Sequence, residues 1–331
     1  MINYEDIIGL GLESSCDETA AAIVKNGKQI LSNTIFSQIR LHKEYFGVVP
    51  EIASRAHLEV INDLIDKAMQ EAGVDFKRLN YVAVTNKPGL TGSLLIALQS
   101  AKTLAYTLDI PLIGINHLEA HLYAPFLEGH ELKFPYIGLL ISGGNTAVFE
   151  VKGIDDMEVL AKTTDDAVGE AFDKVAKYLD LSYPGGPVIE KLAKKAVHKK
   201  SLFPKILPDP EDERFSYSGL KTAVVNFVKK NTNIDKAEIV YSFQESALEL
   251  LVRKVFSLSR KKNIVDIVIA GGVASNGRLR EMLNSAKRNE NLIIPSPALC
   301  TDNAAMVGGL GYQYYIQNKF DDMMLEVKAK A

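Results

Sequence analysis

Two histidines four residues apart give the sharpest chemical signal in this sequence. His117 and His121 lie in the segment INHLEAHLYAPF, residues 115–126. On a helix this spacing places both imidazoles on one face, with Cβ atoms about 6 Å apart, which suits two ligands of one metal ion. A helix that carries two histidines by chance is the alternative, but the whole chain has only six histidines. We therefore favour a metal site.

The same segment does not fit a zinc protease. Those enzymes use H-E-x-x-H, in which a glutamate directly follows the first histidine and acts as general base. Here Glu119 comes two places after His117, and at about 100° per residue it points far from the histidine face. The third metal ligand must therefore come from another segment. Asp302, in CTDNAAM, is one candidate, although an aspartate at that point is equally well explained as a helix N-cap.

A polar cluster separates two apolar stretches near the start of the chain, in GLESSCDETAAAIV, residues 11–24. Hydroxyl and backbone N–H groups in such a turn can hold a phosphate, and its carboxylates can orient a cation or a reacting amine. A solvated polar turn is the alternative. No histidine lies near Cys16 in the sequence, so we expect this cysteine to be structural rather than nucleophilic. The polar members of the cluster are Ser14, Ser15, Asp17, Glu18 and Thr19.

Two glycine pairs follow apolar strands in the second half of the chain. LLISGGNTAVF, residues 139–149, contains Gly143 and Gly144, which allow a ligand to approach the backbone closely. In IAGGVASNGRLREML, residues 269–283, a strand, two glycines and a helix follow one another. Such a unit can seat a nucleoside that Asn276 hydrogen bonds, and a simple helix cap is the alternative for Asn276.

These segments lie on elements that recur in the same order in both halves. Each half is expected to run three strands, a helix, a strand, a helix and a strand, with a tight turn after its first strand, which indicates α/β architecture. Two such halves facing each other form a cleft, where ligands commonly bind.

The expected strands are 7–15, the two arms of a hairpin in 20–31 with its turn at Asn26-Gly27, 81–85, 112–115, 136–142, 146–151, 158–164, 264–270 and 292–296. The expected helices are 50–73, 91–108, 166–179 and 302–317, and 198–218 is expected to be irregular.

Length and composition exclude several classes of protein. The 331 residues suit two domains, and 47% hydrophobic with 24% charged residues is the profile of a globular chain. A net charge of −3 excludes a protein whose whole surface is basic and binds nucleic acid, though it does not exclude a local basic patch. No apolar run is long enough to cross a bilayer, and the start of the chain lacks the pattern of a signal peptide. Two cysteines form no disulfide framework, so a reduced cytoplasmic location is expected.

Taken together, the motifs resemble one family across nearly the whole chain and in the same order. The family forms threonylcarbamoyladenosine in tRNA; its bacterial members are called TsaD and were once labelled O-sialoglycoprotein endopeptidases. The motifs that carry the resemblance are SCDET, GVVPEIASRAH, HLEAH, SGGNT, GEAFDK, YPGGP, FSYSGLKTA, AGGVASN and CTDNAAM. Small departures stand at Asn116 and Asn145, where many relatives have histidine.

The resemblance implies a fold and an activity. The fold is a duplicated, two-lobed actin-like α/β fold of the sugar kinase, Hsp70 and actin superfamily, related to ribonuclease H. The first lobe is expected to span residues 1–115 and 302–331, and the second 116–301 with an irregular insertion near 198–218. The implied reaction transfers threonylcarbamoyl from threonylcarbamoyl-adenylate to N6 of the adenosine next to the anticodon on its 3′ side, in tRNAs that read codons beginning with A. AMP is released.

The resemblance also assigns site residues and partners. Asp17 and Glu18 become the acidic pair at the reacting centre, and His117, His121 and Asp302 hold one divalent metal ion, Fe²⁺ in preference to Zn²⁺. The implied substrate-binding residues are Leu140, Ile141, Ser142, Gly143, Gly144, Asp173, Gly186, Glu190 and Asn276. Implied partners are tRNA, an inactive actin-like paralogue of the TsaB type and a small P-loop ATPase of the TsaE type.

Two other classes of function stay open at this point. One is a carbamoyltransferase that uses carbamoyl-adenylate on a small molecule, which the mass of the product distinguishes. The other is a non-catalytic actin-like ATP-binding scaffold, which metal analysis distinguishes. For tRNA contact the richest basic stretch is 191–205, and residues 260–262 form a second cluster.

Overall fold

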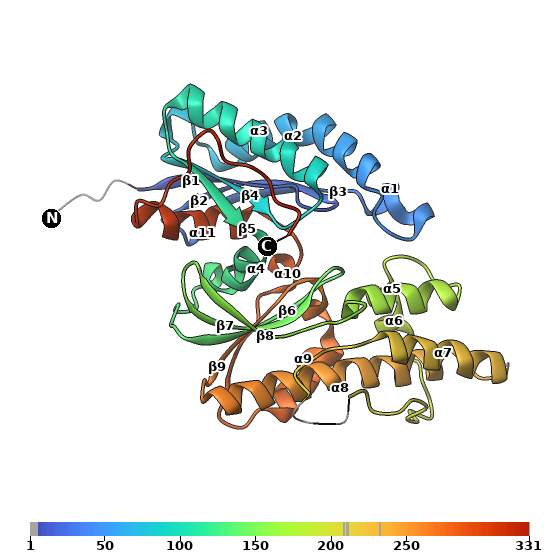
Figure 1. Ribbon diagram of the computed structural model, residues 1–331. Helices are drawn as coiled ribbons and strands as arrows, with labels where there is room; N and C mark the ends of the chain where they lie inside the picture. Colours follow the sequence, from blue (N-terminus) through green and yellow to red (C-terminus); the bar gives the residue numbers. More distant parts are fainter. Residues whose placement is uncertain (1–5, 208, 210–211, 232, 331) are drawn as a thin grey trace. The chain divides into compact units, whose positions relative to one another are not determined.

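The chain forms two compact units, which we describe separately (Figure 1). The computed structural model describes residues 6–207, 209, 212–231 and 233–330. The first unit spans Met1–Leu132 and Thr301–Ala331, and the second spans Lys133–Cys300. The first boundary therefore lies later than the one expected after residue 115. The reason is that helix α4 (His117–Tyr123) packs against α11 (Ala304–Ile316) and the end of β5 (Leu112–Asn116), all within the first unit.

The first unit is built on a five-stranded mixed sheet with the order β3-β2-β1-β4-β5. Antiparallel pairing joins the first three strands, and β4 and β5 are parallel to β1. The expected hairpin at Asn26-Gly27 is present, with positive φ angles of 52° and 66°. Its turn has three residues rather than two, because Lys25 pairs with Gln29. The other strands are β1 (Ile8–Glu13), β2 (Glu18–Lys25), β3 (Gln29–Ser37) and β4 (Tyr81–Lys87).

Helices cover both faces of this sheet. Figure 1 shows α2 (Pro50–Ala72) and α3 (Thr91–Leu108) on one face and α11 on the other. The first of these begins with Pro50 in its first turn and ends before Gly73 at a φ of 63°, as the sequence predicts. Close packing of α11 on β1 needs a glycine, because a Cβ on Gly11 would overlap the Ala304 carbonyl. Short helical segments are α1 (Ile39–His42), η1 (Lys43–Tyr45), η2 (Phe76–Arg78) and η3 (Ala124–Glu128).

The second unit repeats this topology. Its sheet has the order β10-β9-β6-β7-β8, with the first three strands in sequence antiparallel and the last two parallel. The duplication expected from the alternation of elements is therefore confirmed. The strands are β6 (Tyr136–Ile141), β7 (Thr146–Gly153), β8 (Asp156–Lys162), β9 (Asp266–Ala270) and β10 (Asn291–Ile293).

Three helices of the second unit were not assigned from the sequence, namely α6 (Gly185–Ala193), α7 (Ser218–Lys230) and α8 (Lys236–Lys262). The described residues of 198–217 form no helix or strand, as expected, and residues 208, 210 and 211 lie outside the described part. The other helices of this unit are α5 (Val168–Tyr178), η4 (Gly272–Ser275), α9 (Gly277–Ala286) and α10 (Pro297–Cys300).

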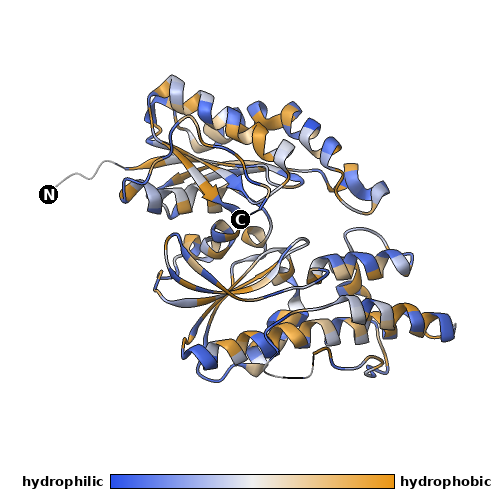
Figure 2. Ribbon diagram, viewed as in Figure 1, coloured by the Kyte–Doolittle hydropathy of each residue, from blue (hydrophilic) through white to orange (hydrophobic). Residues whose placement is uncertain are grey.

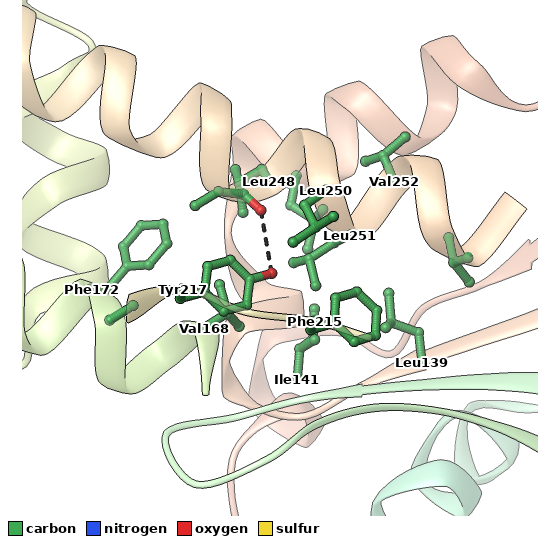
Figure 3. Close-up of a cluster of buried hydrophobic side chains, with 14 of the residues drawn as sticks. Leu139, Ile141, Val168, Phe172, Phe215, Tyr217, Leu248, Leu250, Leu251 and Val252 are labelled. Atoms are coloured by element: carbon green, nitrogen blue, oxygen red, sulfur yellow. Dashed lines mark hydrogen bonds between the residues drawn. The ribbon is translucent and has the colours of Figure 1, made fainter. Parts of the chain in front are cut away.

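The long helix α8 carries much of the apolar core of the second unit (Figure 3). Phe243 packs edge to face on Phe172, with ring centroids 5.0 Å apart. The hydroxyl of the buried Tyr217 donates a hydrogen bond to the Ala247 carbonyl at 3.4 Å. Figure 2 shows that the strands are mainly hydrophobic and that the helices have both polar and apolar faces. In the described part of the chain, every helix is too short or too polar to span a membrane.

Candidate metal centre and acidic turn

The paired histidines lie at the start of a short helix that follows directly on a strand. β5 ends at Asn116, whose side chain caps α4 by accepting a hydrogen bond from the Leu118 N–H at 2.9 Å. This cap starts the helix at His117 and places His121 one turn later. Both imidazoles are buried, with ring centroids 4.6 Å apart. The predicted helical spacing of the pair is confirmed.

Asp302 lies against both histidines. Its Oδ1 is 2.9 Å from His121 Nε2 and 3.7 Å from His117 Nε2. The alternative that Asp302 caps a helix is wrong. Asn303 caps α11 instead, accepting a hydrogen bond from the Met306 N–H at 3.0 Å. The carboxylate of Asp302 is therefore directed at the imidazoles, although 181 residues separate it from His121.

The three side chains fit a divalent metal ion. One donor atom from each of His117, His121 and Asp302 lies within 4.8 Å of the others. Two imidazoles and one carboxylate are the donors of many catalytic Zn²⁺ and Fe²⁺ sites and leave positions open for a substrate. His121 Nδ1 is a buried atom without a hydrogen-bond partner among the described residues. The donor set therefore supports a metal without deciding between iron and zinc.

The charges of His117, Asp302 and their neighbours shift one another's pKa values strongly. Burial alone lowers the pKa of His117, but the negative charges of Glu13 and Asp302 outweigh it and raise this pKa to about 9. Burial raises the pKa of Asp302, and the two imidazoles more than offset this, so that it falls to about 2. In the metal-free protein His117 is therefore protonated at neutral pH, and a cation must displace its proton.

Sequence reasoning missed a buried carboxylate next to His117. Glu13 is the last residue of β1, fully buried, and its Oε2 lies 3.0 Å from His117 Nδ1. Thr85 Oγ1 donates a hydrogen bond to the same Oε2 at 2.6 Å. The available signal was a glutamate at the end of the apolar run IIGLGLE. Ionised side chains are rarely buried without a partner, so a glutamate in a buried strand indicates a nearby polar or charged partner.

The polar turn predicted between the first two strands is held by three backbone carbonyls in a row. Ser15 O accepts from Leu90 N–H at 2.8 Å, and Asp17 O accepts from Gln38 N–H at 3.0 Å. Between them, Cys16 O lies 3.0 Å from Nε2 of the buried His57. A carbonyl only accepts, so this nitrogen donates. His57 was not among the predicted site residues.

The carboxyl of Glu18 in this turn differs from that of an ordinary solvated side chain. Burial raises the pKa of Glu18 to about 10, and the charges of Asp302 and Asp17 act in the same direction. Ser37 Oγ donates a hydrogen bond to Glu18 Oε1 at 3.2 Å. Burial and neighbouring carboxylates also raise the pKa of the Cys16 thiol well above its usual value. The thiol therefore stays protonated at neutral pH, in agreement with the expectation of a structural cysteine.

In the second unit, the end of β6 and the turn that follows it carry five of the predicted substrate-binding residues. Leu140 and Ile141 are buried at the end of the strand, and Ser142 Oγ accepts a hydrogen bond from Asn145 N–H at 3.1 Å. Neither Gly143 nor Gly144 has an atom within 4 Å of the place where a Cβ would stand. The backbone of this turn is therefore accessible, as a ligand-binding glycine loop requires.

Two of the remaining predicted residues of the second unit, Asp173 and Glu190, link one helix to the first residue of another. Asp173 on α5 accepts a hydrogen bond from Gly185 N–H at 2.7 Å, next to Gly186. Glu190 on α6 accepts from the backbone N–H of Gly277, the first residue of α9, at 3.2 Å.

Asn276 stands at the same helix end. It caps α9 by accepting from Leu279 N–H at 2.9 Å, and its amide donates to Gln244 Oε1 at 3.2 Å. The helix-cap interpretation of Asn276 is therefore confirmed, and its contact with a nucleoside stays a prediction.

Comparison with known proteins is consistent with these motifs. Residues 29–309 match the family model for tRNA N6-adenosine threonylcarbamoyltransferase, TsaD. A protein of that name from Clostridium perfringens is 47% identical over 325 residues, which cover 96% of each chain. The protein of the same name from Treponema denticola is 47% identical over 327 residues, covering 97% of this chain and 96% of its own.

Similar solved structures support the fold. HypF from T. kodakarensis aligns with a TM-score of 0.65 and 16% identity, covering 97% of this chain and 49% of HypF. Component A of (R)-2-hydroxyglutaryl-CoA dehydratase from Acidaminococcus fermentans aligns with a TM-score of 0.57 and 14% identity. The alignment covers 94% of this chain and 99% of component A. With the repeated sheet topology, these likenesses establish the duplicated actin-like α/β fold.

Proposed function

Since the chain belongs to the TsaD family of tRNA N6-adenosine threonylcarbamoyltransferases, we propose that it forms threonylcarbamoyladenosine in tRNA. The donor is threonylcarbamoyl-adenylate, and the acceptor is N6 of the adenosine next to the anticodon on its 3′ side, in tRNAs that read codons beginning with A. The observation that carries the proposal is 47% identity over 96% of the chain. The grouping of His117, His121 and Asp302 in the first unit supports it.

The reaction is an acyl transfer whose leaving group is already good. The lone pair of N6 forms a bond to the carbamoyl carbon, the bond from that carbon to the phosphate oxygen breaks, and AMP leaves with the electron pair. The amine loses one proton. A bound divalent metal supplies Lewis-acid polarisation and orientation of the threonylcarbamoyl group. The protein's main task is to position a weakly nucleophilic amine against the carbamoyl carbon.

The proton of the amine is assigned to the acidic pair, with either Asp17 or Glu18 as its acceptor. In the metal-free protein burial and the charges of Asp302 and Asp17 raise the pKa of Glu18 to about 10, and a divalent ion bound at Asp302 would offset part of this rise. We expect loss of the accepting carboxylate, by Asp17→Asn or by Glu18→Gln, to slow single-turnover transfer by about 100-fold or more, and the slower of the two variants identifies the acceptor. Asp63→Asn, at an exposed position on α2, is the matched control. Full transfer rates in both Asp17→Ala and Glu18→Ala would refute the assignment.

The metal is proposed to be Fe²⁺, with Zn²⁺ as the other candidate, because two imidazoles and one carboxylate suit both ions. Chelation should abolish transfer, and anaerobic addition of each ion separately should identify the one that restores it. Restoration by neither ion would contradict the metal proposal.

The lysine-rich stretch at 191–205 is the proposed tRNA contact. The basic side chains of residues 260–262 all form ion pairs, with Glu290, Glu213 and Glu150. In contrast, Lys191, Lys195, Lys199 and Lys200 are exposed and form no ion pair with a described residue. Replacing these four with Gln should weaken tRNA binding and reduce its salt dependence. Replacing residues 260–262 should have the smaller effect.

The activity is tested by incubating the protein with tRNA transcript, threonine, bicarbonate and ATP. The proposed partners, a TsaB-type paralogue and a TsaE-type ATPase, are included, together with the enzyme that makes the adenylate. Mass analysis of the digested nucleosides should show threonylcarbamoyladenosine. A carbamoylated small molecule would support the carbamoyltransferase instead. A cytoplasmic location is part of the proposal and is tested by cell fractionation.

A further inference from the structure

A carboxylate lies directly behind the imidazole of His117, on the side away from Asp302. Glu13 is fully buried at the end of β1, where an ionised group is costly unless hydrogen bonds surround it. This position lies in the interior of the first unit, and Glu13 faces a candidate metal ligand. The residue therefore needs an explanation beyond the stability of the strand.

Three donors surround the carboxylate. The backbone N–H of Ser15 donates to Oε1 at 2.6 Å, and Thr85 Oγ1 donates to Oε2 at 2.6 Å. His117 Nδ1 lies 3.0 Å from the same Oε2 and 3.1 Å from Ser15 Oγ. An ionised carboxylate only accepts hydrogen bonds, so Nδ1 must carry the hydrogen. The neutral ring then has its lone pair on Nε2, the nitrogen that faces Asp302 at 3.7 Å.

The second histidine lacks this support. His121 Nδ1 is buried and has no hydrogen-bond partner among the described residues. The two imidazoles of one helical turn therefore differ, since the orientation and tautomer of His117 are held from behind and those of His121 are not. Carboxylate–histidine pairs behind a metal commonly fix the ring and raise its basicity.

We propose that Glu13 is a positioning residue that holds His117 with Nε2 directed at the metal, and that Thr85 and the Ser15 backbone hold Glu13 in turn. This inference rests on the metal site of the proposed function. It assigns to Glu13 no contact with the substrate or with the metal itself.

Metal affinity of the purified full-length protein tests the proposal without any assay of tRNA modification. Metal-free wild type and Glu13→Gln are titrated with Zn²⁺ in competition with a chromophoric chelator. The amide has the size of the carboxylate but no charge. Above the pKa of His117, where no proton competes with the metal, we expect affinity to fall by about 10- to 100-fold. Thr85→Val should cause a smaller loss in the same direction. Glu119→Gln is the matched control, because Glu119 lies on the same helix as both histidines but bonds to the Tyr314 hydroxyl.

A spectroscopic measurement separates positioning from a general loss of structure. In wild type, long-range ¹H–¹⁵N spectra of the Zn²⁺ form should show the His117 ring protonated at Nδ1. In Glu13→Gln the Nδ1 signal should shift or broaden while the other backbone amide signals stay those of the folded protein, although loss of the buried ion pair with protonated His117 lowers the melting temperature of the metal-free form. If Glu13→Gln does not fold, Thr85→Val carries the same test.

The outcomes are distinct. Unchanged Zn²⁺ affinity in Glu13→Gln, or equal losses in Glu13→Gln and Glu119→Gln, would overturn the role of Glu13 and leave the metal site intact. If the wild type binds no Zn²⁺, Fe²⁺ or Co²⁺, the metal site of the proposed function is wrong and this inference with it.

Discussion

The protonation of His117 makes metal binding depend on pH in a defined direction. In the metal-free protein the carboxylates of Glu13 and Asp302 overcome the effect of burial and raise the pKa of His117 to about 9. A metal and a proton compete for Nε2, since Glu13 already occupies the Nδ1 side. Metal affinity should therefore increase as pH rises, until His117 is neutral without the metal.

The size of the effect follows from that pKa. Below a pKa of about 9, the apparent dissociation constant should fall about tenfold for each unit of pH, and above it the constant should level off. Between about pH 6.5 and about pH 8.5 the expected fall is about 80-fold, or about 2.6 kcal/mol of binding free energy. The carboxylate of Asp302, with its pKa lowered to about 2, adds no dependence in this range.

Two measurements check this prediction. Competition titrations with Zn²⁺ over that pH range give the slope directly, once corrected for the pH dependence of the chelator. Calorimetry at neutral pH, in buffers with different heats of ionisation, counts the protons released, and about one proton per metal is expected. An affinity independent of pH, with no proton released, would show that His117 is neutral before the metal binds and would refute the electrostatic reasoning.

Packing, backbone contact and ionisation give three further predictions. Phe243→Ala should lower the free energy of unfolding by about 3–5 kcal/mol in a urea titration, because the ring is fully buried; a loss under about 1 kcal/mol would contradict the packing described. Gly11→Ala should lower the melting temperature, because its Cβ would overlap the Ala304 carbonyl, and an unchanged value would argue against that contact. Burial alone raises the pKa of Glu290, but hydrogen bonds from the Arg288 backbone and Arg260 outweigh it and lower this pKa below 4.5. Its stabilisation should therefore be present above pH 4.5 and be lost as pH falls through the lowered pKa, and Glu290→Gln should flatten this acid dependence of unfolding.

Local sequence signals predicted the elements that carry the site. Apolar periodicity between Pro50 and Gly73 predicts helix 50–73, and the structure agrees within a residue. The predicted helix 91–108 is also confirmed. The hairpin at Asn26-Gly27 was predicted because these residues adopt positive φ, although the strand register makes its turn one residue longer. Such features depend on neighbours in the chain, which is why they can be predicted without coordinates.

Features that depend on distant contacts could not be predicted in this way. Asp302 and Asn303 are both good helix caps, and only the fold shows that Asn303 caps α11 while Asp302 faces His121. No role was predicted for Glu13, because its partners Thr85 and His117 are 72 and 104 residues away. Helix α6 was not predicted because it begins within the segment Pro184-Gly185-Gly186-Pro187, whose residues are typical of a loop.

The central claim is that two imidazoles from one helical turn and a distant carboxylate hold one divalent ion. Its most direct test is the number of ions bound per chain, measured by elemental analysis after dialysis against a low concentration of free metal. Wild type should bind one ion, and His117→Ala, His121→Ala and Asp302→Ala should each bind almost none while they remain folded. Full occupancy in any of these three folded variants would contradict the claim.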